Sequence, residues 1–463
     1  MRLFDSLPNP SPLFAALVAV GLALPAGGRA AEDVPAFEVG SYGRFQLGSD
    51  LQGRPGHQTN VVAFGPRLIE PSYQQLDFYY RVLAPTGELG TRARLVAALG
   101  LGEEAFHYTG RFEASLALRN LYVEVEDVLA RDLSIWAGSR MYRGDDIFLL
   151  DCWPLDNLNT LGAGAQARLG GLEAAVHFGV NRLDNVYQLQ ILEAPIEEGI
   201  GARSDVSLER QRSILSLRLV HPVTDHGRAR LYFERHDLPP GEQVNPESGE
   251  IKALPRDAGW LLGAQATAWS GDGLWASVWG KLGMGLGAYG ELTAPFGLSL
   301  DRKAEGARFG LVAVSGAIER SRFALPVAAL FASFRDASGL PNNARDYEEL
   351  VLNARPVVYL TDTVHLALDA SWQLRAPHAF SADGVTPARA SVAQFGVMPM
   401  IAPAGTGLWS RPALRLIYAV RLLSDDARRV LYPETDVRRE RGVEHYLGAG
   451  VEWWFNSTYA QAK

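Results

Sequence analysis

Aromatic and charged side chains alternate at four places in the sequence, in stretches where every second residue lies on the same face of an extended chain. In "SYGRFQLG", Tyr42 shares a face with Arg44, whereas Phe45 and Leu47 lie on the opposite face. Three further rings follow the pattern: Tyr73 with Gln75 and Asp77, Trp409 with Arg411 and Arg415, and Trp454 with Glu452. An aromatic ring stacks on the apolar face of a pyranose, while Arg and carboxylate groups bind the hydroxyls around its rim. The pattern indicates non-covalent binding of sugars.

Each ring also has a plainer interpretation. Tyr and Trp form belts at membrane interfaces, and they fill space inside barrels. Taken singly, each of the four rings is better explained in this way. Their common position on a polar face favours sugar contact for the four together. Trp275 and Trp279 share a face with Lys281 and are candidates for further rings.

The elements that carry these rings alternate with a period of two, and helical spacing is rare. In residues 411–423, Leu414 and Leu416 share one face, while Arg415 and Arg421 share the other. Such a pattern forms either a soluble sandwich, whose apolar face lies in a core, or a transmembrane barrel, whose apolar face contacts lipid.

Three features favour the barrel. The segments run for about ten residues, which crosses a bilayer when the strand is tilted. Aromatic residues gather at strand ends, and the polar faces carry Arg and carboxylates. In addition to these three features, the long polar insertions at 237–259 and 424–442 suit extracellular loops. We predict an all-β fold, a transmembrane antiparallel β-barrel of about 18 strands in a single domain.

The composition and the N-terminal region indicate an exported protein. The chain has 463 residues, a net charge of −8 and one cysteine, Cys152. The charge argues against a nucleic-acid partner, and a lone cysteine forms no internal disulfide. An apolar run over residues 13–24 is followed by small residues up to Ala30, which predicts a signal peptide over residues 1–31 and a barrel over residues 32–463.

Four blocks resemble the maltoporin family of sugar-selective outer-membrane porins. They are "SIWAGSRMYRGDDIFLLDCWPLDNLNTLGAGAQ" (134–166), "LWSRPALRLIYAV" (408–420), "GAGVEWWF" (448–455) and "SYGRFQLG" (41–48). The stretch from about 181 to 395 does not align. The resemblance implies an 18-stranded barrel with an inward-folded constriction loop. It also implies a homotrimer in contact with lipid, in the outer membrane of a Gram-negative bacterium.

The resemblance also implies roles for individual residues. These are an aromatic slide of Tyr42, Tyr73, Trp409 and Trp454, a polar track of Arg44, Arg67 and Arg119, and a constriction loop with Asp146, Asp151 and Trp153. Arg119 has the parity of the apolar residues Leu121 and Val123, so we expect a strand end or a bulge there. Asp146 and Asp151 could instead serve to fold the loop. Trp153 could instead pack the inward loop against the barrel wall.

The sequence departs from the family at several positions. Gly144 replaces a track arginine, Phe148 a histidine and Gln75 a glutamate, so we expect a less charged constriction. The last strand is followed by "NSTYAQAK", whereas the family ends on its final aromatic residue. These departures leave the choice of sugar open.

Other chemistry has little support in the sequence. The nine histidines lack ligand spacing, so we expect no metal and no cofactor. Asp146 and Asp151 could form a glycosidase pair, but loops place such pairs anywhere, so we expect no catalytic residue and no enzyme. Cys152 is expected to be a free thiol. The sequence favours facilitated diffusion of maltodextrins or related oligosaccharides. A general porin without sugar selectivity and an exported soluble carbohydrate-binding β-protein are the alternatives.

Overall fold

The strands of this chain close on themselves. The computed structural model describes residues 36–103, 110, 116–195, 202–245 and 247–458. The predicted signal peptide, residues 1–31, lies outside the described residues. One compact unit, Phe37–Lys463, contains the described strands, and its last strand, β23 (Val443–Phe455), pairs with its first, β1 (Phe37–Ser49). Closure leaves no open edge, so the backbone groups of the strands are satisfied within the sheet.

The remaining elements follow in chain order. The first part of the barrel comprises β2 (Tyr73–Thr86), β3 (Thr91–Leu101), β4 (Leu116–Glu126), β5 (Leu133–Arg143), β6 (Asn157–Leu169), β7 (Leu172–Asn181), β10 (Arg212–Thr224) and β11 (Gly227–Leu238). The second part comprises β14 (Asp257–Trp269), β15 (Leu274–Gly285), β16 (Arg308–Arg320), β17 (Phe323–Arg335), β18 (Tyr347–Ala354), β19 (Val357–Tyr359), β20 (Val364–Pro377), β21 (Ala390–Ile401) and β22 (Ala413–Leu423). Outside the barrel sheet lie the hairpins β8 (Leu189–Pro195) with β9 (Ala202–Glu209) and β12 (Gly241–Val244) with β13 (Ile251–Leu254), the helix α2 (Asp425–Leu431), and the 3-10 turns η3 (Phe148–Leu150), η4 (Leu286–Tyr289) and η5 (Val437–Glu440).

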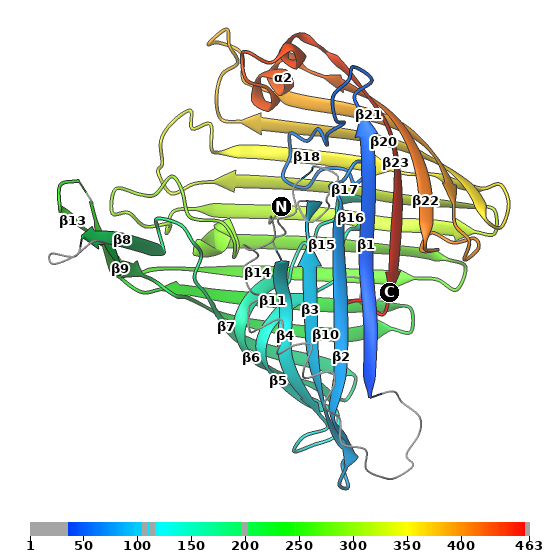
Figure 1. Ribbon diagram of the computed structural model, residues 1–463, viewed down its shortest axis with the longest axis horizontal. Helices are drawn as coiled ribbons and strands as arrows, with labels where there is room; N and C mark the ends of the chain where they lie inside the picture. Colours follow the sequence, from blue (N-terminus) through cyan, green and yellow to red (C-terminus); the bar gives the residue numbers. More distant parts are fainter. Residues whose placement is uncertain (1–35, 104–109, 111–115, 196–201, 246, 459–463) are drawn as a thin grey trace, which may run out of the picture. The chain divides into compact units, whose positions relative to one another are not determined.

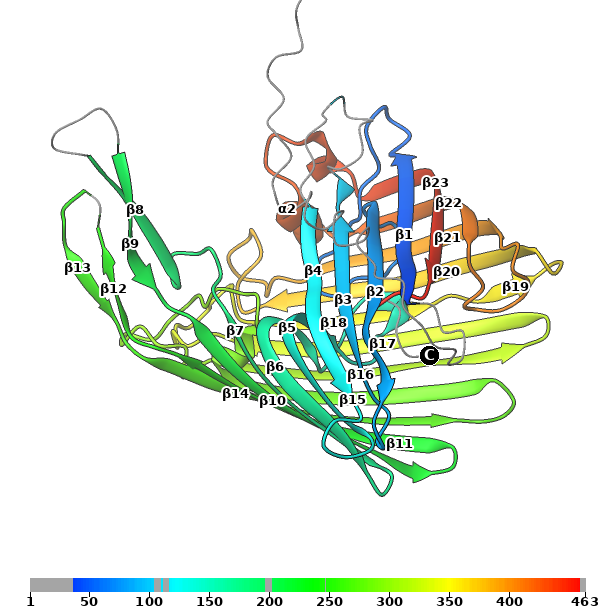
Figure 2. The ribbon, with the colours of Figure 1, turned by 60° about the horizontal axis from the view of Figure 1, so that its bottom comes forward.

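The barrel has the predicted 18 strands. The closed sheet contains 19 strand segments. Two of them, β18 and β19, both pair with β17 on one side and with β20 on the other, so they occupy one position in the wall. Strands β1 to β4 run across the direction of strands β14 to β18 in both ribbon views (Figure 1, Figure 2). Opposite walls cross in this way when the strands of a barrel are tilted.

Long and short connections alternate around the barrel. The connections at residues 50–72, 144–156 and 286–307 are long, whereas those at 170–171 and 321–322 are tight turns. Outer-membrane barrels have short turns on the periplasmic side and long loops outside. The start of β1 and the end of β23 lie at the short-turn end, which is therefore the periplasmic end.

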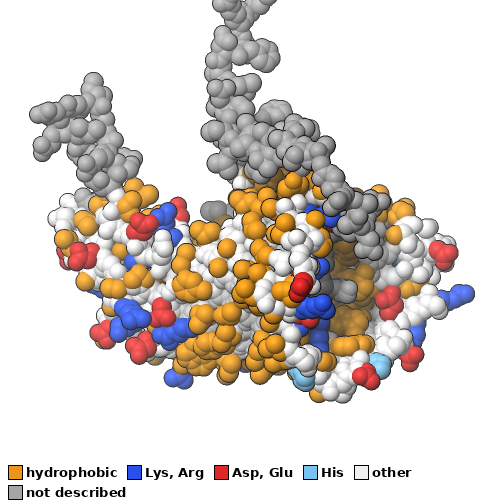
Figure 3. All heavy atoms as spheres, turned by 90° about the horizontal axis from the view of Figure 1, so that it is seen from below, with side chains coloured by type: hydrophobic (Ala, Val, Ile, Leu, Met, Phe, Trp, Pro, Cys, Tyr) orange, Lys and Arg blue, Asp and Glu red, His pale blue; other side chains and the backbone are white. Residues whose placement is uncertain are grey.

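The outer face of the barrel is apolar and the inner face is polar. On β20, Leu368 and Trp372 are 47% and 37% exposed, whereas their neighbours Asp369 and Gln373 are buried. Apolar side chains gather in the middle of the face seen in Figure 3, and charged side chains lie mainly toward its margins. A soluble protein would bury the apolar face, so the alternative of a soluble β-protein is wrong. Among the described residues, no helix is long and apolar enough to cross a bilayer.

Two long connections fold into the barrel. The inward loop (residues 144–156) places Ile147, Leu149 and Leu155 against apolar side chains that line the inside of β16 to β18, such as Leu311 and Leu330. Burying each such side chain contributes about 1.5–3 kcal/mol, which holds the loop against this wall. The first inward segment (residues 50–72) joins the same apolar cluster through Val61 and Val62.

Candidate functional site

Three of the four predicted rings lie side by side on the inner face. Tyr42 on β1 pairs with Trp454 on β23 and with Gln75 on β2, and residues paired across neighbouring strands share a face. The rings of Tyr42 and Trp454 are stacked with centroids 6.5 Å apart, and the Tyr73 ring lies 6.1 Å from that of Tyr42. Gln75 is buried whereas Phe455, the neighbour of Trp454, is 55% exposed, so the shared face is the interior. We name Tyr73, Tyr42 and Trp454 the ring row.

Trp409 reaches the interior by another route. It precedes β22, in the irregular connection 402–412, so strand parity does not place it. Its ring meets that of Phe148 in the inward loop edge-on, with centroids 4.9 Å apart and planes at 82°. Phe148 therefore adds a ring beside a predicted one. Sequence reasoning treated this residue only as a loss of polarity.

Guanidinium groups lie over the ring row. The Arg44 group is 6.0 Å from the ring centre of Tyr42 and 5.9 Å from that of Tyr73. The Arg411 group lies 4.1 Å from the ring centre of Trp454. Stacking and hydrogen-bonding groups thus alternate along one path, as the recognition of a sugar face and its rim requires.

Glu452 is the shared acceptor of this path. It is 2% exposed, and it accepts hydrogen bonds from the Tyr42 hydroxyl at 3.3 Å and from Arg67 at 2.6 Å. Arg411 lies 2.8 Å from the same carboxylate, and Arg415 also bonds to it. One buried carboxylate therefore orients three guanidinium groups and one phenol.

Arg67 belongs to the first inward segment rather than to the wall. Its guanidinium also bonds to Glu70 at 2.8 Å, and its backbone N–H donates to the carbonyl of Leu149 in the inward loop at 2.8 Å. Its own carbonyl accepts from Arg355, which lies between β18 and β19. The segment therefore bridges the ring row and the inward loop, with a further anchor at the junction of β18 and β19.

Arg119 lies in a β-bulge, and this prediction is confirmed. The register between β3 and β4 jumps at this residue, because Ala98 pairs with Asn120 and Leu99 pairs with Leu118. The bulge turns the Arg119 side chain toward the ring row, where its guanidinium lies 5.6 Å from the Tyr73 ring centre.

Two of the predicted loop residues meet arginines. Asp151 lies 3.2 Å from Arg44, which connects the inward loop to the ring row. Trp153 lies under the guanidinium of Arg143, which is 3.9 Å from its ring centre. Asp151 adopts a left-handed backbone conformation with φ 46°, which turns the chain at the end of η3.

Asp145 is a loop carboxylate that sequence reasoning passed over in favour of the adjacent Asp146. It pairs with Arg228 at 2.8 Å and Arg230 at 3.1 Å, and it accepts a hydrogen bond from Gln265 at 2.7 Å. Burial alone would raise the pKa of Asp145, but the two arginines outweigh it and hold the pKa below its usual range. These partners lie in the stretch that does not align, so no motif could have revealed them.

Gly144 closes the base of the inward loop. Its N–H donates to the carbonyl of Asp156 at 2.9 Å, and a Cβ at this position would lie 1.7 Å from the Asp156 carboxylate. A larger residue at this position would require a rearrangement of the loop base.

Trp279 is not part of the ring row. It is 2% exposed and packs in the apolar cluster between the inward loop and the wall. Trp275 is partly buried against a second cluster, which contains Leu68 and Ile69 of the first inward segment. Both rings serve packing, which is the plainer interpretation.

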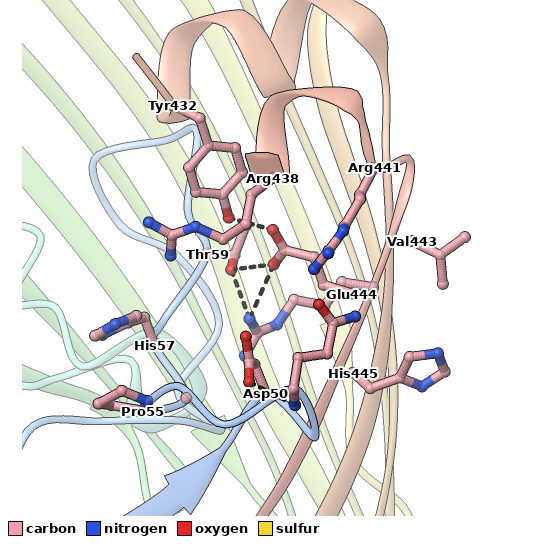
Figure 4. A pocket seen from close by; sticks show the side chains of 13 residues that line it. Asp50, Pro55, His57, Thr59, Tyr432, Arg438, Arg441, Val443, Glu444 and His445 are labelled. Atoms are coloured by element: carbon pink, nitrogen blue, oxygen red, sulfur yellow. Dashed lines mark hydrogen bonds and ion pairs between the residues drawn. The ribbon is translucent and has the colours of Figure 1, made fainter. Parts of the chain in front are cut away.

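A polar pocket lies at the long-loop end, between the first inward segment and the β22–β23 connection (Figure 4). Glu444 accepts a hydrogen bond from Thr59 at 3.0 Å and another from Tyr432, and Arg421 lies 3.4 Å away. Sequence reasoning named Arg421 only as part of a polar strand face and did not name Thr59, Tyr432 or Glu444, because the pocket joins segments that are almost 400 residues apart.

We expect the Cys152 thiol to resist a maleimide in the folded barrel and to react once the protein is unfolded. The side chain is free and 1% exposed. Burial raises the pKa of the thiol above its usual range, so little of the reactive thiolate is present near pH 7. Mass spectrometry of folded and heat-unfolded protein checks the expectation.

The control places a cysteine in a hairpin. Ser248 is exposed between β12 and β13, so Ser248→Cys combined with Cys152→Ser should label before unfolding. Rapid labelling of Cys152 in the folded protein would show that the inward loop leaves the wall.

The described residues contain no group of three or more His, Cys, Asp or Glu side chains placed to hold a metal ion. The site is instead built from rings, guanidinium groups and carboxylates.

The chain was compared with curated proteins and with solved structures. No curated protein matches the chain. Solved structures similar to it include OccK2 of Pseudomonas aeruginosa (11% identity, TM-score 0.47, covering 90% of this chain and 98% of that one), OccAB1 of Acinetobacter baumannii (10%, 0.46, 90% and 96%) and OmpT of Vibrio cholerae (9%, 0.40, 91% and 100%).

The family model that matches is described as LamB porin, and it spans residues 40–455. The match covers the barrel from β1 to the last residue of β23. The chain therefore belongs to the LamB porin family, and it is a porin of the Gram-negative outer membrane.

Proposed function

We propose that this porin conducts maltodextrins or related oligosaccharides by facilitated diffusion, without covalent chemistry. The observation that carries the proposal is the ring row with guanidinium groups over it. A general pore needs charge on its inner face, but it has no need of three adjacent rings there, of which Tyr73 and Trp454 are partly exposed and Tyr42 is buried between them.

In the proposed mechanism, a sugar ring stacks on the partly exposed rings of Trp454 and Tyr73, and the buried Tyr42 ring between them supports both. Arg44 and Arg411 lie over the same rings, within reach of the hydroxyls around each pyranose. Each contact is weak and is replaced by an equivalent one at the next ring. Repeated weak sites allow both entry and departure, which conduction requires.

The remaining predicted residues act beside this path. Arg67 completes the polar track from the first inward segment, where it bonds to the Tyr42 hydroxyl, and Arg119 completes it from the bulge beside Tyr73. Asp146, Asp151 and Trp153 belong to the constriction, and Trp409 extends the row of rings through Phe148. The pairing of Asp151 with Arg44 favours a binding role over an acid–base role.

We also propose that the protein is a homotrimer and that residues 1–31 are removed as a signal peptide. The trimer is what the resemblance to the maltoporins implies. The signal peptide rests on the apolar run at 13–24 and the small residues that follow it.

Current through the reconstituted channel tests the function. In a planar bilayer, added maltohexaose should reduce the ionic current in a saturable way, because a bound sugar excludes ions from the constriction. Two other solutes serve as controls. A polyethylene glycol of the size of maltohexaose tests block by size alone, and sucrose tests a smaller saccharide. A current that is reduced equally by all three solutes would show a general porin, and an unaffected current would end the proposal.

A further inference from the structure

The chain turns into the barrel after its last strand. Asn456 follows Phe455 with φ 43°, a left-handed conformation that reverses the chain direction. The carbonyl of Asn456 accepts a hydrogen bond from the Tyr79 hydroxyl at 2.9 Å, and its side-chain amide bonds to Glu38 at 3.2 Å. The next residue, Ser457, is 6% exposed.

The inner segment (residues 456–458) ends on a buried carboxylate of β2. The Ser457 hydroxyl donates to one oxygen of Asp77 at 2.7 Å, and the Thr458 hydroxyl donates to the other. Gln75 donates to Asp77 at 2.9 Å and to the Thr458 hydroxyl at 2.8 Å, and Asn120 on β4 lies 3.3 Å from the same hydroxyl.

This polar cluster continues the ring row toward the periplasm. The Tyr73 hydroxyl donates to Gln75 at 2.9 Å, and Gln75 in turn contacts Asp77. Asp77 lies four positions after Tyr73 on β2, which runs toward the short-turn end. A sugar that leaves the ring row in this direction therefore meets Asp77 next.

Two neighbouring hydroxyls on one carboxylate are also what a sugar presents. A vicinal diol of a pyranose donates to the two oxygens of a carboxylate in the same way. Among the described residues, no ion pair engages Asp77, whose partners are neutral hydroxyl and amide groups. A carboxylate with only neutral partners can exchange one pair of hydroxyls for another, because no cationic partner is left unpaired by the exchange.

We propose that Asp77, with Gln75 and Asn120, is a saccharide-binding subsite at the periplasmic end of the ring row, and that the hydroxyls of Ser457 and Thr458 occupy it when no sugar is present. The inner segment acts as an internal competitor that a passing sugar displaces. This inference rests on the proposed function, since it requires that sugars follow the ring row.

Substitutions in the inner segment test the competition. In Ser457→Ala/Thr458→Val, both hydroxyls are lost and the volume is nearly kept. Maltohexaose should then block the current at about fivefold lower concentration, because the sugar no longer displaces the two hydrogen bonds that these hydroxyls donate to Asp77. Thr86→Val, at the exposed end of β2, is the matched control and should change nothing.

Asp77→Asn isolates the subsite itself. In the Ser457→Ala/Thr458→Val variant the inner segment no longer competes with sugar for Asp77. Adding Asp77→Asn to this variant should raise the half-blocking concentration of maltohexaose back to the wild-type value. Heat-modifiable mobility on a denaturing gel reports that each variant is folded.

The possible outcomes separate the two proposals. If maltohexaose blocks the wild type, Ser457→Ala/Thr458→Val and the triple variant with Asp77→Asn equally, the subsite is refuted and sugar conduction stands. If the wild type is blocked, Ser457→Ala/Thr458→Val is blocked at lower concentration and Asp77→Asn cancels that difference, the subsite stands. If none of the channels is blocked, sugar conduction and the subsite are both refuted.

Discussion

Trp454→Ala should raise the concentration of maltohexaose that half-blocks the channel about tenfold. The Trp454 ring is stacked on Tyr42 with the planes at 13°, and it lies under the Arg411 guanidinium. Aromatic stacking contributes about 0.5–1.5 kcal/mol beyond the area that it buries, and about 1.4 kcal/mol corresponds to a factor of ten. Titration of the current with sugar in a planar bilayer measures the shift.

The neighbouring residue provides the control. Phe455 is an aromatic residue of the same strand, but it is 55% exposed on the outer face. Phe455→Ala should leave the half-blocking concentration unchanged, because its ring cannot meet a solute in the lumen. A periodicity of two predicts opposite results for adjacent residues, whereas a general loosening of the strand would affect both.

The conductance without sugar gives a second measurement. Removing the Trp454 ring widens the path, so the ionic conductance of Trp454→Ala should rise while its sugar block weakens. If Trp454→Ala and Phe455→Ala both bind maltohexaose like the wild type, the ring row serves only packing inside the barrel. The general porin is then the better interpretation.

Alternation predicted the faces of the barrel because the side-chain period of a strand is two. Leu47 is 76% exposed and Tyr42 is 1% exposed, as the pattern in "SYGRFQLG" requires. The same argument predicted a strand end or a bulge at Arg119, because a charged residue with apolar parity must be shifted, and the structure has the bulge. Parity failed for Trp409, because β22 begins only at Ala413.

The courses of the connections could not be predicted from the sequence. Arg67 and Glu452 are 385 residues apart, and their contact depends on the closure of the barrel. Asp145 and Asp146 are adjacent in the chain, and the turn of the inward loop decides which of them faces Arg228 and Arg230. Such contacts arise from tertiary packing, which local periodicity does not contain.

Glu452→Gln should destabilise the folded barrel by about 3 kcal/mol or more. The carboxylate is 2% exposed and is shared by Arg67, Arg411 and Arg415. Breaking a buried ion pair by neutralising one partner costs about 3–5 kcal/mol, because the other charge remains buried without compensation. Arg67 keeps a second carboxylate in Glu70, but the described partners of Arg411 and Arg415 include no other acid.

The temperature at which the folded band converts to the unfolded band on a denaturing gel measures the loss. Glu434→Gln is the matched control, because Glu434 is 89% exposed and lies 3.8 Å from Arg439. An exposed pair contributes about 0–1 kcal/mol, so this variant should convert at the temperature of the wild type.

Ion selectivity distinguishes a lost charge from a lost shape. Glu452→Gln removes one negative charge from the lumen and leaves the three arginines, so the reversal potential in a salt gradient should move toward anion selectivity. Glu452→Ala removes the same charge and also the hydrogen-bonding group, so it should give the same reversal potential with a larger loss of stability. The prediction is contradicted if Glu452→Gln converts at the temperature of the wild type and keeps the wild-type reversal potential. In that case Glu452 does not orient the arginines beside the ring row, and Glu70 and Asp151 must orient them instead.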